Sequence, residues 1–301
     1  MAAPVAAARL RCSYSADERD DPLPGTAAHA MGYLLIEAPG AWGQNALSES
    51  RLDPEIANLV AARAAELSYR VLLIKRPGRA AVEPRRAWAV VSSTPGAEST
   101  TWGSYASDRE LLDIPLAPDA AIAPPPSALY LVCTHGRHDA CCALRGRAVA
   151  ARLAVLRPGE VWECSHIGGD RFAPNVLVLP HGLYYGRVEP GRALDVVTAQ
   201  ERAEIVIDLL RGRSVFRPPV QAAQHFARLA HGSVLIDDLD PIGGRHTADS
   251  ADVSVDLAHG DLRMTVTVRP TVGDEAGLLT CKATHPLHPP TFTLKGIELH
   301  D

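Results

Sequence analysis

The densest group of chemically active side chains in this 301-residue chain is CTHGRHDACC at 133–142, with three of six cysteines and two of twelve histidines. Thiolates and imidazoles are the side chains that bind soft transition metals, and neighbouring thiols also carry out redox chemistry. A hydrophobic core has no need of so many of them. The stretch therefore predicts a metal site or a redox dithiol.

A second group of such side chains follows in WECSHIGGD at 162–170, where His166 and Asp170 stand four positions apart. The two glycines between them permit backbone conformations that bring a loop close to a bound group. In the first stretch, Cys133 and Cys142 form a C-x8-C pair. We interpret these four residues as one site that is built from two loops.

The elements that must position the site follow a repeated order. Hydrophobic periodicity predicts a strand, a helix and three strands in the first half, at 32–38, 51–67, 70–75, 87–92 and 99–105. The second half repeats this order and adds a helix, at 128–133, 142–156, 160–165, 175–180, 183–188 and 198–212. A Thr198/Glu201 capping box and Gly212 predict the two ends of the last helix. Because a β-α-β unit is parallel, both site loops are expected at one edge of the sheet.

This order of elements is that of a thioredoxin-like fold, so we expect an α/β protein of three parts. Residues 1–122 form a similar but degenerate half without metal ligands, and 123–214 form the β-α-β-β-β-α domain that carries the site. The stretch APPPS at 123–127 is the expected linker. A helix from about 215 and short strands at 252–258, 262–268 and 291–299 predict a small α+β domain at 215–301.

Composition excludes several classes of function. A net charge of −5 offers no basic surface for nucleic acid. No apolar run approaches the roughly 20 residues that span a bilayer, and the start of the chain lacks the regions of a secretory signal. We therefore expect a cytoplasmic protein without a membrane partner. Thiols in that compartment stay reduced, bind metal or do redox work.

The longer segments CTHGRHDACCALRGRAVAARL and VWECSHIGGDRFAPNVLVLPHGLYYGRV, with GTAAHAMGYLLIEAPGAWGQNAL upstream, resemble the sucrase/ferredoxin-like family. Its characterised members are thioredoxin-like ferredoxins, so the resemblance implies a 2Fe–2S cluster. In the fungal members, a C-x8-C pair holds one iron and an H-x3-H pair holds the other. Cys133, Cys142 and His166 match three of these ligands, and Asp170 stands at the position of the second histidine.

This departure leaves the fourth ligand open. Asp170 could bind iron through oxygen, or accept a hydrogen bond from a ligand N–H. Cys164 lies two residues before His166 and would face the same side of an extended strand. Cys141 adjoins Cys142 and could replace it. The other cysteines, Cys12 and Cys281, are interpreted as buried small hydrophobic residues, and His135 and His138 as loop residues or spare ligands.

The expected function is electron transfer rather than the conversion of a substrate. The protein would accept one electron from a reductase and pass it to an acceptor, so its partner would be a redox protein; its oligomeric state is open. Two alternatives use the same residues. One is a metal-free dithiol oxidoreductase, built on Cys133 and Cys142 or on the adjacent pair of Cys141 and Cys142. The other is a zinc protein with Cys2His(Asp) ligation.

Overall fold

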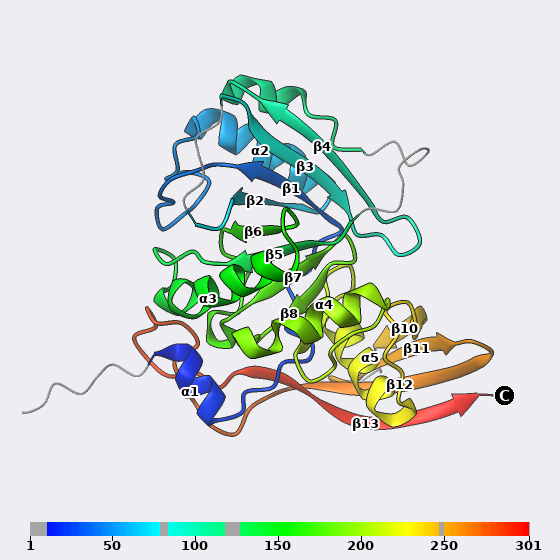
Figure 1. The fold of residues 1–301 in the computed structure, drawn as a ribbon. Helices are drawn as coiled ribbons and strands as arrows, with labels where there is room; N and C mark the ends of the chain where they lie inside the picture. Colours follow the sequence, from blue (N-terminus) through cyan, green and yellow to red (C-terminus); the bar gives the residue numbers. More distant parts are fainter. Residues whose placement is uncertain (1–10, 79–83, 118–126, 247–249, 301) are drawn as a thin grey trace, which may run out of the picture.

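A computed structural model describes residues 11–78, 84–117, 127–246 and 250–300, and its described strands form two sheets (Figure 1). The larger sheet has nine strands in the order β4-β3-β1-β2-β6-β5-β7-β8-β9. Most neighbouring strands in it are antiparallel, and the exceptions are the pairs β1/β2 and β5/β6. The smaller sheet has four antiparallel strands in the order β10-β11-β12-β13.

The first half has all five of the strands and helices predicted for it, and a short helix before and after them. They are α1 (Cys12–Glu18), β1 (Gly32–Glu37), α2 (Pro54–Glu66), β2 (Tyr69–Lys75), β3 (Arg86–Ser92), β4 (Ser99–Tyr105) and the 3-10 helix η1 (Asp108–Asp113). Helix α2 begins where the Asp53 side chain accepts the N–H groups of Glu55 and Ile56, as expected of a helix N-cap. Its stripe of buried residues packs on one face of the sheet. Helix α1 lies in a region that the sequence interpretation left without a helix.

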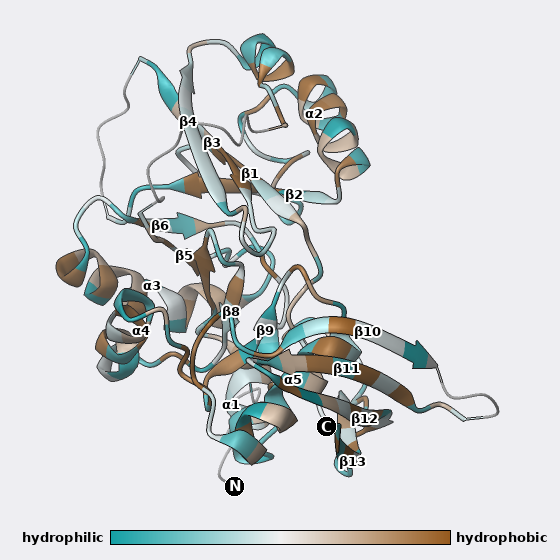
Figure 2. Ribbon diagram, turned by 90° about the vertical axis from the view of Figure 1, so that its right-hand side faces the viewer, coloured by the Kyte–Doolittle hydropathy of each residue, from teal (hydrophilic) through white to brown (hydrophobic). Residues whose placement is uncertain are grey.

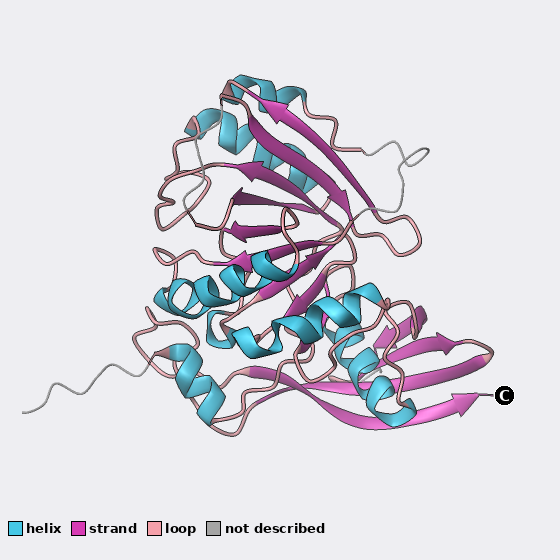
Figure 3. Cartoon of the chain, in the orientation of Figure 1, coloured by secondary structure: helices cyan, strands magenta, loops and turns pink. Residues whose placement is uncertain are grey.

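The second half positions the candidate site. Its elements are β5 (Leu129–Cys133), α3 (Ala140–Leu156), β6 (Val161–Cys164), η2 (Asp170–Phe172), β7 (Val176–Leu179), β8 (Leu183–Tyr185), η3 (Pro190–Arg192), α4 (Ala193–Glu201) and β9 (Leu210–Arg213). Every residue of β5 is buried, and the strand is hydrophobic along most of its length (Figure 2). Helices α3 and α4 cover the face of the sheet that carries Tyr130 and Val132 (Figure 3).

The two halves share an order of strands. In each half the first strand lies between the second and the third, which gives β4-β3-β1-β2 in one half and β6-β5-β7-β8 in the other. The halves meet where β2 pairs with β6, antiparallel, through Ile74 with Cys164 and Lys75 with Glu163. The expected repeat of one pattern is therefore visible in the sheet. The expected domain boundary at 122/123 and residues 123–126 of the linker lie outside the described residues.

The last part of the chain is an α+β unit, as expected. It comprises α5 (Pro218–His231), β10 (Asp240–His246), β11 (Val253–His259), β12 (Leu262–Val272) and β13 (Pro290–His300), and β10 was not predicted. Ala223 and Ala227 of α5 pack on Val255, Met264 and Val266 of the small sheet. In the described part of the chain, no helix is long and apolar enough to cross a membrane.

The predicted helix at 198–212 is wrong in its bounds and in its second half. Helix α4 ends at Glu201, Ala203 has a positive φ of 53°, and Gly212 lies in β9 with a φ of 146°. Thr198 is therefore inside the helix and makes no N-terminal capping box. The apolar residues of 205–209 look helical in sequence, but they pack into the core with residues of β5, β7 and β8 from an irregular segment that leads into β9. Tertiary burial overrides the local pattern here.

Candidate metal centre

The predicted cysteine pair meets at the end of β5. Cys133 is the last residue of β5, Cys142 is in the first turn of α3, and both thiols are buried. Gly146, one turn further along α3, faces the backbone of Cys133. A Cβ atom at Gly146 would lie only 2.3 Å from the Cys133 carbonyl oxygen. The glycine thus lets α3 approach β5 closely enough to bring the two thiols together.

The loop that carries His166 and Asp170 emerges beside this pair. It follows β6, the parallel neighbour of β5, and Cys164 stands opposite Cys133 in their register. His166 Nδ1 lies 3.1 Å from Asp170 Oδ1, without the alignment of a hydrogen bond, and the Cys142 thiol donates to the same oxygen at 3.4 Å. The ligand atoms of Cys133, Cys142 and His166 all lie within 4.8 Å of one another.

The backbone of this loop is fixed by three polar side chains. Arg70 donates to the carbonyl oxygens of residues 166 and 167, Arg211 to that of residue 168 at 2.8 Å, and Asn175 to that of residue 169 at 2.8 Å. Arg211 is fully buried and also donates to the Asn175 amide oxygen. Every carbonyl between the two predicted ligands therefore has a defined direction, as a preorganised binding loop requires.

His138 comes closer to the site than the sequence interpretation placed it. Its ring stacks on that of His166 with centroids 3.7 Å apart and planes 16° from parallel. Its Nε2 lies 3.9 Å from Asp170 Oδ2. His135 is engaged elsewhere, because its two ring nitrogens contact the His166 N–H and the Gly43 carbonyl. His138 is thus a candidate ligand, whereas His135 positions the backbone.

The site is buried on its cysteine side and open on its histidine side. The side chain of Asp170 is 4% exposed and that of His138 is 37% exposed. A pocket of about 400 Å³ is lined by His135, His138, His166 and residues 44–47, among others. A metal or cluster bound here would face solvent on the side that contacts the histidines.

The side chains of the site form a network of charges. Hydrogen bonding with Cys142 lowers the pKa of Cys133 well below the ordinary thiol value, and the same contact raises that of Cys142. Burial lowers the pKa of His166, but Asp170 and Cys133 outweigh it and raise the value to about 9. Burial favours neutral Asp170, yet His166 holds its pKa below the usual range. These contacts favour the thiolate of Cys133 and the carboxylate of Asp170, whereas His166 has to lose a proton before it can bind a metal.

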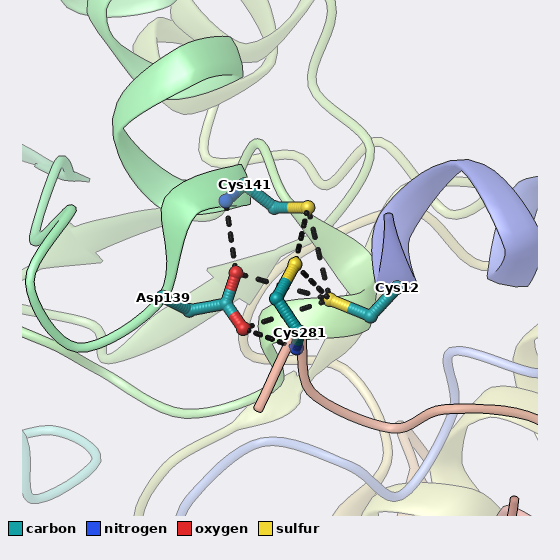
Figure 4. A group of neighbouring side chains, drawn as sticks. All are labelled: Cys12, Asp139, Cys141 and Cys281. Atoms are coloured by element: carbon teal, nitrogen blue, oxygen red, sulfur yellow. Dashed lines mark hydrogen bonds between the residues drawn. The ribbon is translucent and has the colours of Figure 1, made fainter. Parts of the chain in front are cut away.

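The structure brings together the four residues of the predicted site, and their role as ligands stays a prediction. Of the alternatives, Cys164 is buried and belongs to neither group of ligand atoms around His166. Cys141 faces away from the site and joins Cys12, Asp139 and Cys281 in a separate group (Figure 4). The sequence interpretation missed Arg70 and Arg211. An isolated arginine gives no sequence signal, and Arg211 stood in a segment expected to be helical.

A comparison with known families agrees with this geometry. Residues 23–212, more than half of the chain, match the sequence profile of the sucrase/ferredoxin-like family. The chain belongs to the sucrase/ferredoxin-like family. No curated protein and no solved structure matches it. The sucrase/ferredoxin-like region contains both site loops, Arg70 and Arg211, whereas α1, α5 and the small sheet lie outside it.

Proposed function

We propose that this protein is an electron carrier with a 2Fe–2S cluster held between β5, α3 and the loop at 166–170. Cys133 and Cys142 would hold one iron, and His166 and Asp170 the other. The observation that carries the proposal is the meeting of two buried thiols with a histidine and a carboxylate on a loop whose backbone is fixed. When bound, such a cluster supplies one-electron transfer.

The donor set and its surroundings fit an anionic group. Two thiolates and an imidazole are ligands that iron–sulfur clusters take in proteins. Arg70 and Arg211 direct their hydrogen bonds to carbonyl, hydroxyl and amide oxygens, none of which carries a formal charge. Their positive charge is therefore free to offset that of a bound cluster.

The spacing of the donors favours a second candidate, a single zinc ion. The Cys142 to Asp170 distance of 3.4 Å and the His166 to Asp170 distance of 3.1 Å suit ligands of one ion. Cys142 and Asp170 would hold different irons of a 2Fe–2S cluster and would have to move apart to bind it, whereas His166 and Asp170 would share one iron. A single zinc ion bound by two cysteines, a histidine and an aspartate would need no such movement.

The identity of the fourth ligand is part of the proposal. We assign Asp170, because it contacts both Cys142 and His166 and is almost completely buried. The contact of His138 with Asp170 makes it the main competitor. If His138 were the fourth ligand, Asp170 would instead accept hydrogen bonds from the N–H groups of His138 and His166. Cys164, which lies opposite Cys133 across the strand pair, is the remaining candidate.

The proposed partner is a redox protein, a reductase or an acceptor, in the cytoplasm. It would dock over the pocket at His138 and His166, where the site is nearest to solvent. The strand order β6-β5-β7-β8 with α4 after it supports a thioredoxin-like arrangement for the domain. In such an arrangement the loops after the first and second strands carry the reactive group.

Metal analysis tests this proposal directly. Protein purified anaerobically should contain about two irons and two sulfides per chain, and the reduced form should give an EPR signal. Cys133→Ser and Cys142→Ser should both lose the iron, and Cys164→Ser should keep it, which would exclude Cys164 as the fourth ligand. If the wild type contains zinc that Cys133→Ser loses, the site binds a single zinc ion and the cluster proposal is wrong. Protein with neither metal would point to a dithiol oxidoreductase.

A further inference from the structure

A second group of metal-binding side chains lies on the other side of the α3 N-terminus. Cys12, Asp139, Cys141 and Cys281 converge from three distant segments of the chain: α1, the start of α3 and the loop between β12 and β13 (Figure 4). The first three are fully buried and Cys281 is partly buried. Their ligand atoms all lie within 4.8 Å of one another.

The spacing of the sulfur atoms matches a single small ion. The Sγ–Sγ distances are 3.7 Å from Cys12 to Cys141, 3.3 Å from Cys141 to Cys281 and 3.6 Å from Cys281 to Cys12. Tetrahedral zinc with Zn–S bonds of about 2.3 Å would separate neighbouring sulfurs by about 3.8 Å. A carboxylate oxygen as fourth ligand would lie about 3.6 Å from each sulfur. Cys12 Sγ is 3.7 Å from Asp139 Oδ2.

The Asp139 carboxylate is already oriented for this role. Its Oδ1 accepts the Cys141 N–H at 2.8 Å, and its Oδ2 accepts the Cys281 N–H at 2.6 Å. An ionised carboxylate has about four lone-pair sites, so capacity for a metal remains. These two hydrogen bonds also fix the backbone of two of the cysteines. The carboxylate and its partners thus resemble the supporting contacts that orient metal ligands.

A buried hydroxyl without a hydrogen-bond partner of its own lies beside this group. Ser13 Oγ is fully buried and has no hydrogen-bond partner among the described residues. Ser13 directly follows Cys12 in α1 and lies next to the Cys141 thiol. Ser13 is therefore placed to donate to a thiolate at Cys141. A metal-bound cysteine is such a thiolate.

We propose that Cys12, Asp139, Cys141 and Cys281 bind one structural zinc ion. Binding would form three Zn–S bonds and one Zn–O bond, and the thiol protons would be released to solvent. All four positions are filled by protein, as is usual for structural rather than catalytic zinc. A disulfide would join only two of the thiols and leave the third without a partner.

The zinc would tie the ends of the chain to the sucrase/ferredoxin-like region. Cys12 and Cys281 lie outside the residues that match the family, and Asp139 and Cys141 lie inside them. The bound ion would hold α1 and the loop before β13 against the first turn of α3. That turn also carries Cys142, so the zinc would stabilise the backbone of the neighbouring candidate site.

Zinc content tests the inference independently of the iron. Full-length protein purified anaerobically should contain about one zinc per chain, and Cys133→Ser, which removes a ligand of the other site, should keep it. Cys12→Ser and Cys281→Ser should each lose the zinc. Cobalt(II) added to the zinc-free wild type should give the thiolate charge-transfer absorption of a tetrahedral site, and these two variants should not.

A milder substitution at Asp139 tests the proposal even if the cysteine variants fail to fold. Asp139→Asn keeps the size of the side chain and should weaken zinc binding by at least about 10-fold, the lower limit of the loss when a residue that only orients a ligand is changed, without unfolding the protein. Circular dichroism would verify the fold of each variant. Three results would overturn the inference: no zinc in the wild type, unchanged zinc in folded Cys12→Ser and Cys281→Ser, or a Cys141–Cys281 disulfide in anaerobically alkylated protein.

Discussion

Cys141 and Cys142 are consecutive residues of α3, yet their thiols belong to two different groups. Cys142 Sγ donates to Asp170 Oδ1 at 3.4 Å, and Cys141 Sγ lies 3.3 Å from that of Cys281. Successive side chains of an α-helix project about 100° apart, since a turn takes about 3.6 residues. The first turn of α3 therefore contributes to two sites at once.

This relationship predicts opposite results for two neighbouring substitutions. Cys142→Ser should abolish the iron content and visible absorption of anaerobically purified protein, because it removes one of two thiolates on the same iron. Cys141→Ser should keep the iron and lose the zinc. Metal analysis of both variants by mass spectrometry is the measurement. Loss of iron from Cys141→Ser alone would mean that Cys141, and not Cys142, is the second cysteine ligand beside Cys133.

The fourth ligand should be visible in the midpoint potential. A carboxylate oxygen is a harder ligand than imidazole and stabilises ferric iron, so Asp170 ligation predicts a potential below the Rieske range of about −150 to +300 mV. Asp170→Ala should change the EPR spectrum, and His138→Ala should leave it unchanged. Pulsed EPR that detects two histidine nitrogens in the wild type would instead assign His138 as the ligand.

The main parts of the fold and the site could be predicted from the sequence, for reasons that are local. Strands such as β5 are uniformly apolar, and α2 and α3 have clear hydrophobic periodicity, so their existence follows from pattern alone. The parallel pairing of β5 with β6 then brings Cys133 near His166. What the sequence interpretation missed depends on contacts between distant segments: the burial of Arg211, the strand β9, and the meeting of Cys12 with Cys281.

Arg211 should control the retention of the cluster although it is not a ligand. Its guanidinium donates to the carbonyls of Thr26 and Gly168 and to the amide oxygen of Asn175. Arg211→Met removes these bonds and leaves buried acceptors without partners, which should cost about 2–4 kcal/mol of stability. Chemical denaturation gives the stability, and iron content before and after gel filtration gives the retention.

A matched control for Arg211→Met is Arg192→Met. Among the described residues, the side chain of Arg192 pairs only with Asp195 and Asp208, and these ion pairs are exposed. Such pairs contribute about 0–1 kcal/mol. The control should therefore keep its iron and nearly all of its stability. Equal effects of the two substitutions would show that the loop at 166–169 does not depend on Arg211.

Gly146 should be irreplaceable for steric reasons. Gly146→Ala would place a Cβ atom 2.3 Å from the Cys133 carbonyl oxygen, so α3 would have to move away from β5. Overpacking of this kind costs about 1–3 kcal/mol, and here it would also separate the two thiols. Gly191→Ala, which meets no atom within 4 Å, is the control. The melting temperature, measured by thermal denaturation, and the iron content should fall for Gly146→Ala only.

His225 should make the protein less stable in mild acid. Burial, and to a lesser extent the charge of Arg228, lowers its pKa from the ordinary value to about 4. The unfolded chain therefore binds a proton more readily than the folded one. The stability contributed by neutral His225 is fully present above the unfolded pKa of about 6.5 and is lost as pH falls toward 4.

Between pH 7 and pH 5 this linkage amounts to about 1–2 kcal/mol of unfolding free energy. Urea denaturation at the two pH values would measure it. His225→Leu should reduce the loss by that amount, because leucine cannot take up a proton in either state, and at pH 7 both proteins should retain their fold. An equal loss in wild type and variant would mean that His225 titrates normally. Because α5 packs on β9, which carries Arg211, the loss in the wild type should be accompanied by weaker retention of iron.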